Sequence, residues 1–296
     1  MSLVTRMLEP AVVERLGALQ LSARRVVEGA TSGAHRSPFK GASVEFRQHR
    51  AYVPGDEPKR LDWRILGRTN RPYVKEYDEE TNLRCAIVLD CSGSMLYRGE
   101  HAVATKFDYA VKLVASLAYL MLARTESVGL ALVSQRLNRW IAPAARSQQL
   151  PRLLEELERA VPAGPAQPNR ALREVGDHLG RRSLVILVSD LIAPVSVLRE
   201  GIARLHHDRH ELILLRVLDR DEVTFPFRSA SRFNGLEGEA AQLLDPAMIR
   251  KTYLENFRRH EQELKDVSQL LGAELATLVT DRPMIDELTL FLKQRA

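Results

Sequence analysis

The sequence contains only two cysteines among its 296 residues, and both flank one short apolar segment. An extended strand rises about 3.3 Å per residue, so Cys85 and Cys91 are expected to lie roughly 20 Å apart. A disulfide requires Cα atoms within about 7 Å of each other. This spacing excludes a disulfide between them and predicts two reduced thiols in a reducing compartment.

Long hydrophobic runs are missing as well. The longest apolar run covers residues 113–123, which is shorter than the roughly 20 residues that cross a bilayer. Residues 1–10 are interrupted by Arg6 and Glu9 and therefore lack the apolar centre of a signal peptide. We accordingly expect a cytoplasmic protein without a membrane span.

Basic charge is concentrated in one part of the chain. Residues 36–75 contain ten Lys or Arg against four Asp or Glu, a balance of +6, whereas the whole chain carries +5. The excess makes a nucleic-acid-associated protein the alternative function, using residues 36–75. No helix-turn-helix, zinc or RNA-binding signature accompanies these residues, so no nucleic-acid partner is expected.

Short alternating segments predict strands between residues 43 and 82, and the Pro-Gly-Asp sequence at 54–56 predicts a turn. The polar and aromatic residues of this segment form either a docking surface or an internal clamp on the rest of the protein. A β-segment of this length is not stable alone, which favours the clamp. The clamp would place Trp63 over apolar surface, in which case Trp63→Ala would cost about 3 kcal/mol.

The rest of the sequence predicts an α/β fold. Residues 10–28 show helical periodicity. From residue 84 onwards, apolar runs at 85–89, 128–133, 184–188, 212–218 and 275–279 alternate with helical patterns. Runs of this kind indicate a doubly wound, mainly parallel sheet with helices on both faces. We therefore predict an N-terminal helix and basic β-rich segment in residues 1–82, packed on a Rossmann-type α/β domain in residues 83–296.

One motif with the chemistry of a cation site directly follows the first apolar run. Asp90, Ser92 and Ser94 offer one carboxylate and two hydroxyls at alternate positions, and Gly93 permits a tight turn. Hard oxygen donors of this kind suit Mg²⁺ or Mn²⁺. Asp190 follows another apolar run, and ligands in open α/β folds bind at the carboxyl ends of strands. The simpler interpretation is a polar strand-to-helix turn capped by Asp90.

The same loop does not match the enzymatic motifs that it superficially resembles. A nucleophile elbow requires glycine two residues before the serine, where Asp90 stands. A phosphate-binding loop requires Gly-Lys-Ser/Thr, which does not follow. An aspartyl-phosphate mechanism would require a second aspartate at Ser92. Since no base or nucleophile can be named, we expect a protein that is not an enzyme.

Residues 90–94 resemble the Asp-x-Ser-x-Ser signature of the metal-ion-dependent adhesion site in von Willebrand factor A domains. The resemblance implies that Asp190 is the third-loop aspartate of that site. The second-loop threonine of the family should fall near residues 164–166, where Ala166 stands and cannot coordinate. Gln167 or Asn169 then substitutes, water fills the gap, or the cation binds weakly.

Nearly the whole chain resembles a bacterial family known as domain-of-unknown-function family fifty-eight. The resemblance rests on residues 33–37, 45–56, 60–64 and 73–76 and continues into the Asp90 loop. Members of that family are commonly encoded beside MoxR-type AAA+ ATPases. The resemblance implies a chaperone-like adaptor that assembles or activates other protein complexes, with the ATPase and a client protein as its partners.

A histidine cluster at residues 206–210 is the remaining candidate metal site. His206 and His210 are four residues apart, but no carboxylate accompanies them in a recognised zinc pattern. Histidines at the end of a helix also complement its dipole. We therefore expect a structural role for this cluster.

Overall fold

The structure is a computed structural model that describes residues 44–53, 61–69, 71–79, 83–180, 182–229 and 231–295. It divides into two compact units, one within Thr31–Asn82 and one that includes Leu83–Ala296. The helix predicted over residues 10–28 and the turn predicted at 54–56 lie outside the described residues.

In the smaller unit, β1 (Val44–Ala51) pairs antiparallel with β2 (Tyr73–Glu79), so both predicted strands are present. A short helix, α3 (Trp63–Thr69), lies between them in the sequence and was not predicted. It begins because Asp62 Oδ1 accepts a hydrogen bond from the backbone N–H of Arg64 at 2.9 Å, as a helix-capping aspartate does.

Trp63 is the first residue of α3, and nothing in its own unit buries it. The side chain is 67% exposed, and α3 contains no buried residue. Within this unit alone, removal of the indole should therefore cost little. The packing of residues 1–82 on the α/β domain stays a prediction.

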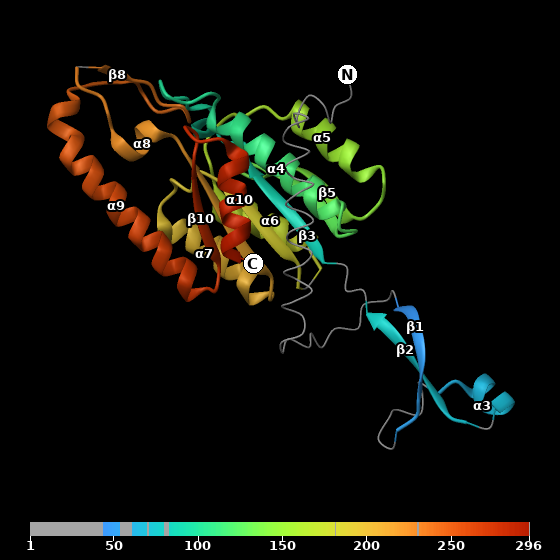
Figure 1. Ribbon diagram of the computed structural model, residues 1–296. Helices are drawn as coiled ribbons and strands as arrows, with labels where there is room; N and C mark the ends of the chain where they lie inside the picture. Colours follow the sequence, from blue (N-terminus) through green and yellow to red (C-terminus); the bar gives the residue numbers. More distant parts are fainter. Residues whose placement is uncertain are drawn as a thin grey trace. The chain divides into compact units, whose positions relative to one another are not determined.

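The larger unit is built on a six-stranded sheet in the order β10-β7-β6-β3-β4-β5 (Figure 1). Its strands are β3 (Arg84–Asp90), β4 (Ser127–Val133), β5 (Leu137–Ala144), β6 (Leu184–Ser189), β7 (Glu211–Leu218) and β10 (Glu274–Val279). All neighbours pair in parallel except the edge strand β5. The predicted doubly wound, mainly parallel sheet is thus confirmed.

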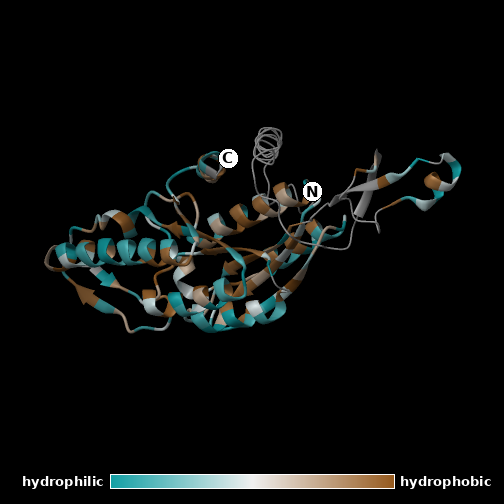
Figure 2. Ribbon diagram, turned by 90° about the horizontal axis from the view of Figure 1, so that it is seen from below, coloured by the Kyte–Doolittle hydropathy of each residue, from teal (hydrophilic) through white to brown (hydrophobic). Residues whose placement is uncertain are grey.

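Helices cover both faces of this sheet, which explains why β3 and β6 are almost continuously apolar. The helices are α4 (Lys106–Leu122), α5 (Gln149–Arg159), α6 (Pro168–His178), α7 (Val195–His207), α9 (Pro246–Leu270) and α10 (Met284–Arg295). Buried residues of α4, α5 and α10 form one core with the sheet, and those of α6, α7 and α9 form the other. Figure 2 shows hydrophilic residues along the long helix α9.

Three smaller elements complete this unit. A 3-10 helix, η2 (Gly93–Leu96), follows β3, and a short helix, α8 (Arg220–Thr224), follows β7. An antiparallel hairpin of β8 (Ser231–Phe233) and β9 (Gln242–Leu244) precedes α9. Within the described residues, no helix is long and apolar enough to span a membrane.

Candidate functional site

The sheet order places the ends of two polar loops side by side. From β3 the chain adds β4 on one side of β3 and later adds β6 on the other side. The order in which strands are added therefore reverses between β3 and β6. Leu89 pairs with Val188 in the parallel register, and Asp90 and Asp190 follow these positions. The predicted site therefore lies at the switch point where open α/β sheets bind ligands.

Asp90 is held by hydrogen bonds to both oxygens of its carboxylate. Oδ1 accepts from the backbone N–H of Ser92 at 2.8 Å, and Oδ2 accepts from the hydroxyl of Ser189 at 2.6 Å. The side chain is buried, and burial together with the charge of Asp190 raises its pKa to about 6. Each carboxylate oxygen keeps a further lone pair, so Asp90 remains able to bind a cation.

The two serines of the motif lie beside this carboxylate. Ser92 precedes η2 and Ser94 is its second residue, and their hydroxyl oxygens are 3.1 Å apart. Cys91, which directly precedes Ser92 in the sequence, is a buried free thiol, as is Cys85. Burial and the charge of Asp90 raise the pKa of the Cys91 thiol to about 12. Cys91 is therefore a packing residue and is protonated at neutral pH.

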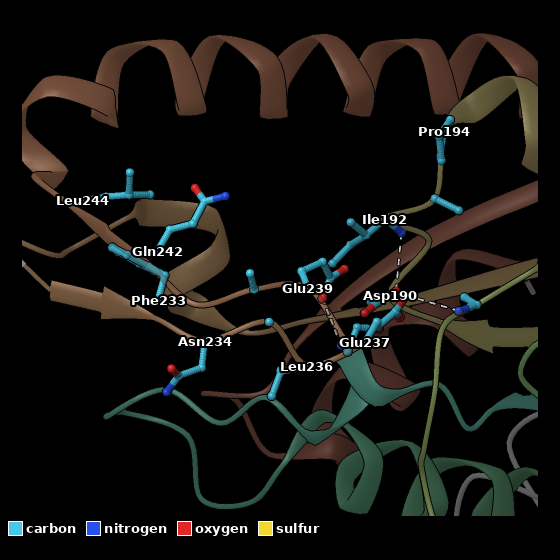
Figure 3. A pocket seen from close by; sticks show the side chains of 15 residues that line it. Asp190, Ile192, Pro194, Phe233, Asn234, Leu236, Glu237, Glu239, Gln242 and Leu244 are labelled. Atoms are coloured by element: carbon cyan, nitrogen blue, oxygen red, sulfur yellow. Dashed lines mark hydrogen bonds between the residues drawn. The ribbon is translucent and has the colours of Figure 1, made fainter.

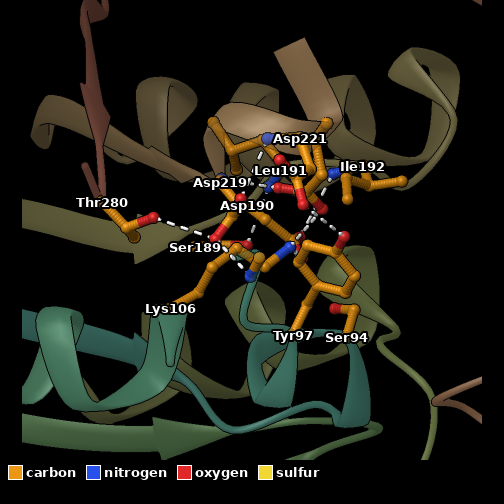
Figure 4. Close-up of polar contacts among 12 residues, drawn as sticks. Ser94, Tyr97, Lys106, Ser189, Asp190, Leu191, Ile192, Asp219, Asp221 and Thr280 are labelled. Atoms are coloured by element: carbon orange, nitrogen blue, oxygen red, sulfur yellow. Dashed lines mark hydrogen bonds and ion pairs between the residues drawn. The ribbon is translucent and has the colours of Figure 1, made fainter. Parts of the chain in front are cut away.

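Asp190 is joined to a buried lysine that the sequence analysis did not assign to the site. Lys106 Nζ lies 2.8 Å from Asp190 Oδ2 and 2.6 Å from Glu222 Oε1, as Figure 4 shows for the Lys106–Asp190 side. Burial disfavours the ammonium, but the two carboxylates outweigh it and hold the pKa of Lys106 above its usual value. The lysine thus remains charged in the interior.

Arg216 adds a second buried cation. Its Nε donates to the backbone carbonyl of Asp190 at 3.1 Å, and its guanidinium lies 5.2 Å from the centre of the Phe257 ring. Burial lowers the pKa of Arg216, although an arginine stays charged even so. Lys106 is thus paired with Asp190 and Glu222, and Arg216 holds the backbone of the Asp190 loop.

Two signals in the sequence could have revealed these partners. Lys106 is the first residue of an apolar helix, where its charge is unfavourable to the helix dipole. Arg216 interrupts an apolar strand that the fold buries on both faces, and an unpaired charge is almost never buried completely. Each residue therefore required a buried carboxylate or carbonyl partner that the sequence alone could not identify.

Ala166 lies where the second-loop ligand of a von Willebrand factor A domain was expected. It lines a cavity of about 540 Å³ together with Ser94 and Asp190. Neither of the proposed substitutes lines that cavity: Gln167 is exposed, and Asn169 Nδ2 donates to Glu200 at 3.1 Å. Substitution for Ala166 by Gln167 or Asn169 stays a prediction, which this arrangement does not support.

The histidines of the predicted cluster differ in burial. His206 and His207 are exposed in the last turn of α7, whereas His210 is buried. His210 Nδ1 accepts a hydrogen bond from the backbone N–H of Ser183 at 3.1 Å. In the part of the chain that the structure describes, no three His, Cys, Asp or Glu side chains gather closely enough to hold a metal.

The residues at the switch point fit a hard divalent cation. Asp90 and Asp190 are buried at the ends of neighbouring strands, and burial together with the charge of Asp190 raises the pKa of Asp90. Two serine hydroxyls add neutral oxygen donors, the type that Mg²⁺ and Mn²⁺ prefer. The assignment of Asp90, Ser92, Ser94 and Asp190 as ligands stays a prediction, which this donor set supports.

Curated relatives exist in mycobacteria. An uncharacterised protein of Mycobacterium tuberculosis strain H37Rv is 26% identical over 293 residues, which cover 97% of this chain and 90% of the relative. An uncharacterised protein of Mycobacterium avium is 27% identical over 118 residues, covering 39% of this chain and 68% of that protein.

Solved structures with a similar fold include von Willebrand factor A domains. The conserved hypothetical protein BatB from Bacteroides thetaiotaomicron is 12% identical, with a TM-score of 0.46 over 71% of this chain and 99% of BatB. The SpRpn10 VWA domain is 11% identical, with a TM-score of 0.43 over 72% of this chain and 95% of that domain.

The family assignment comes from the sequence itself. Residues 48–263 match the family described as protein of unknown function DUF58. The matched region includes residues 48–75 of the basic segment, the Asp90 loop, the Asp190 loop and the hairpin before α9. The chain therefore belongs to the DUF58 family.

Proposed function

We propose that this chain is a non-catalytic adaptor that binds an acidic residue of a partner protein through a divalent cation. The observation that carries the proposal is the convergence of Asp90 and Asp190 at the switch point of the sheet, beside Ser92 and Ser94. Ser94 and Asp190 also line the 540 Å³ cavity, so the cation would be accessible to a partner.

Mg²⁺ or Mn²⁺ would be held by Asp90, Ser92, Ser94 and Asp190. Lys106 keeps one oxygen of Asp190 in place, while the other faces only a long hydrogen bond of 3.4 Å from the backbone of Ile192. A cation with few charged ligands retains positive charge, and a carboxylate is the partner group that best complements it.

The chemistry of the described site favours recognition over catalysis. The Cys91 thiol is protonated and buried, and the ammonium of Lys106 is neutralised by two carboxylates. Neither group is therefore available as a nucleophile or a general base. The two serine hydroxyls lie near each other and near no histidine among the hydrogen bonds of the described residues.

The resemblance to a family encoded beside MoxR-type AAA+ ATPases suggests the biological setting. In this proposal, the ATPase supplies energy in the cytoplasm, and this chain contacts either the ATPase ring or an unknown client protein. Binding would assemble or activate the client complex. The cation would make that contact conditional on an exposed Asp or Glu side chain of the partner.

A pull-down tests the proposal directly. The full chain is incubated with the neighbouring ATPase and with cell lysate, in Mg²⁺ or in chelator. At least one partner should be lost on chelation, and Asp90→Ala and Ser92→Ala should lose the same partner while keeping a native circular dichroism spectrum. Asp177→Ala, a change at an exposed carboxylate of α6, is the matched control. If every partner survives chelation and both substitutions, cation-mediated binding is wrong.

A further inference from the structure

A buried arginine of strand β7, Arg216, lines a cavity that the proposed cation site does not use. Arg216 is 1% exposed, and its Nε donates to the backbone carbonyl of Asp190 at 3.1 Å. Among the described residues, neither of its terminal nitrogens, Nη1 and Nη2, donates a hydrogen bond. A guanidinium has donors on all three nitrogens, so those of Nη1 and Nη2 are left for another group.

The carboxylates nearest to this guanidinium in charge are paired with other cations. Asp190 and Glu222 pair with Lys106 at 2.8 and 2.6 Å. Glu261 pairs with Lys265 at 2.7 Å. Within the described part of the chain, no carboxylate forms an ion pair with the guanidinium itself. A buried charge is costly unless it is paired and hydrogen-bonded, so the position opposite Nη1 and Nη2 suits a carboxylate brought by a ligand.

The cavity beside Arg216 has a volume of about 210 Å³, and residues of β7, α8 and α9 line it. Leu218 and Phe257 give it apolar walls, and the Phe257 ring centre lies 5.2 Å from the guanidinium. Asn256, an exposed residue of α9, also lines it. Pockets for drug-sized ligands have volumes of about 300 to 1,000 Å³. The occupant of this cavity would therefore be a smaller molecule.

This cavity is distinct from the 540 Å³ cavity at the switch point. Among the described lining residues, the two have only Ile192 in common. Figure 3 shows Ile192 beside Asp190 in the larger cavity. Neither Asp90 nor Ser92 lines the smaller cavity, so a ligand there would not be a ligand of the proposed cation.

We propose that the smaller cavity binds a small monocarboxylate with an apolar body, whose two carboxylate oxygens accept from Nη1 and Nη2 of Arg216. The planar guanidinium matches a carboxylate in this two-point geometry. The apolar body packs against Phe257 and Leu218, which the cavity already presents. This site goes beyond the proposed adaptor function and does not depend on the cation.

Calorimetric titration of the full chain with benzoate tests the site. The protein is first freed of divalent cations on a chelating resin, because a cation at the switch point would itself attract a carboxylate. Benzamide has the same flat apolar body without the charge. Benzoate should bind, and benzamide should bind about tenfold more weakly or less, the loss expected when a hydrogen bond to a charged group is replaced by a neutral one.

Two variants locate the binding. Arg216→Lys keeps the positive charge but not the planar pair of donors, and the affinity for benzoate should fall by about tenfold or more. Asn256→Asp adds a negative charge at an exposed lining residue and keeps the oxygen that accepts from Arg259 at 2.9 Å. Its affinity should fall about two- to fivefold, the scale of an exposed charge interaction. Gln269→Glu, which adds the same charge at an exposed position of α9 outside the cavity, is the matched control and should bind as the wild type does.

Circular dichroism and thermal melting show whether each variant is folded. If Arg216→Lys unfolds, Asn256→Asp decides the result, because its side chain is exposed. The proposal is wrong if the wild type does not bind benzoate or binds benzamide equally well. Wild-type affinity in either folded variant, or an equal loss in Gln269→Glu and Asn256→Asp, would also overturn it.

Discussion

Two regions meet at Asp190: the buried ion pairs of Lys106 with Asp190 and Glu222, and the hydrogen-bonded carboxylate of Asp90. They differ in how the buried negative charge is compensated. On one side, Lys106 joins Asp190 to Glu222, and the lysine has no exposed surface. On the other side, Asp90 has hydroxyl and backbone donors but no cation of its own, and its pKa is raised. Lys106 compensates the buried carboxylates of the first region, whereas in the second region Asp90 has neutral donors as its hydrogen-bond partners among the described residues.

The contrast indicates that two neighbours of Asp190 have different roles. Lys106 stabilises the fold, and Asp90 is the candidate for cation binding. A buried ion pair costs little only while both partners are present, since removing one leaves an uncompensated charge. An ionised carboxylate whose pKa is raised in the folded state lowers the free energy of unfolding. A cation bound to that carboxylate would offset the loss.

Lys106→Met should have the largest effect. It leaves Asp190 and Glu222 buried without their cation, and we expect a loss of about 3 to 5 kcal/mol in the free energy of unfolding. Urea denaturation in the presence of chelator measures it. Lys251→Met, at an exposed position of α9, should change stability by less than about 0.5 kcal/mol. Equal effects of the two substitutions would show that the interior network does not stabilise the fold.

Asp90→Asn should act in the opposite direction when no cation is present. The pKa of Asp90 is raised from 3.8 to about 6, and one pKa unit corresponds to about 1.4 kcal/mol. At pH 7 in chelator, the variant should therefore be more stable by up to about 3 kcal/mol. Urea denaturation with and without saturating Mg²⁺ measures the difference, which should narrow when the wild type binds the cation.

The stability gain of Asp90→Asn should depend on pH because the pKa of Asp90 is raised in the folded protein. The ionised carboxylate is the unfavourable form in the folded protein, so the advantage of Asp90→Asn is full above pH 6. It should shrink as the pH falls through 6 and vanish below about 3.8, where Asp90 is protonated in both states. An advantage that does not depend on pH would mean that Asp90 is compensated already.

His210 gives a smaller test at the opposite end of β6. Burial lowers the pKa of His210 below its usual 6.5, so its neutral form is favoured in the folded state. Its contribution to stability is present above pH 6.5 and is lost as the pH falls towards the folded pKa. Between pH 7 and 5.5, urea denaturation should show a steeper loss for the wild type than for His210→Gln. The exposed His207 provides the control His207→Gln, whose stability should fall with pH as steeply as that of the wild type.

Trp63→Ala should have the smallest effect. The indole is 67% exposed at the start of α3, and surface substitutions usually change stability by less than about 0.5 kcal/mol. Thermal melting of the full chain should show no resolved shift. A shift that corresponds to several kcal/mol would instead support the predicted packing of the basic segment on the α/β domain.

The strands and helices of the larger unit were predictable because their signals are local. The apolar runs at β3 and β6 can satisfy their hydrogen bonds and bury their side chains only in a covered parallel sheet. The Asp90 motif was visible for the same reason, since its three oxygen donors lie within five residues of one strand end. Helix α3 was missed because its only start signal, the cap at Asp62, lies in a segment dominated by strand-like alternation.

The partners of that motif were not predictable in the same way. Lys106 and Glu222 are 116 residues apart, and they meet only because α4 and α8 begin at the same edge of the sheet. Glu237 reaches Ala166 across 71 residues through the hairpin tip. Neither pairing leaves a pattern in the sequence, because the interaction depends on a distance in space.

The sequence by itself therefore determined the α/β class, the position of the oxygen donors at strand ends and the absence of a threonine at Ala166. Only the tertiary structure decided which charges neutralise one another and which residue lies opposite Ala166. The physical reason is that hydrophobic periodicity acts over one turn or one strand, whereas ion pairing acts between groups that folding brings within a few ångströms.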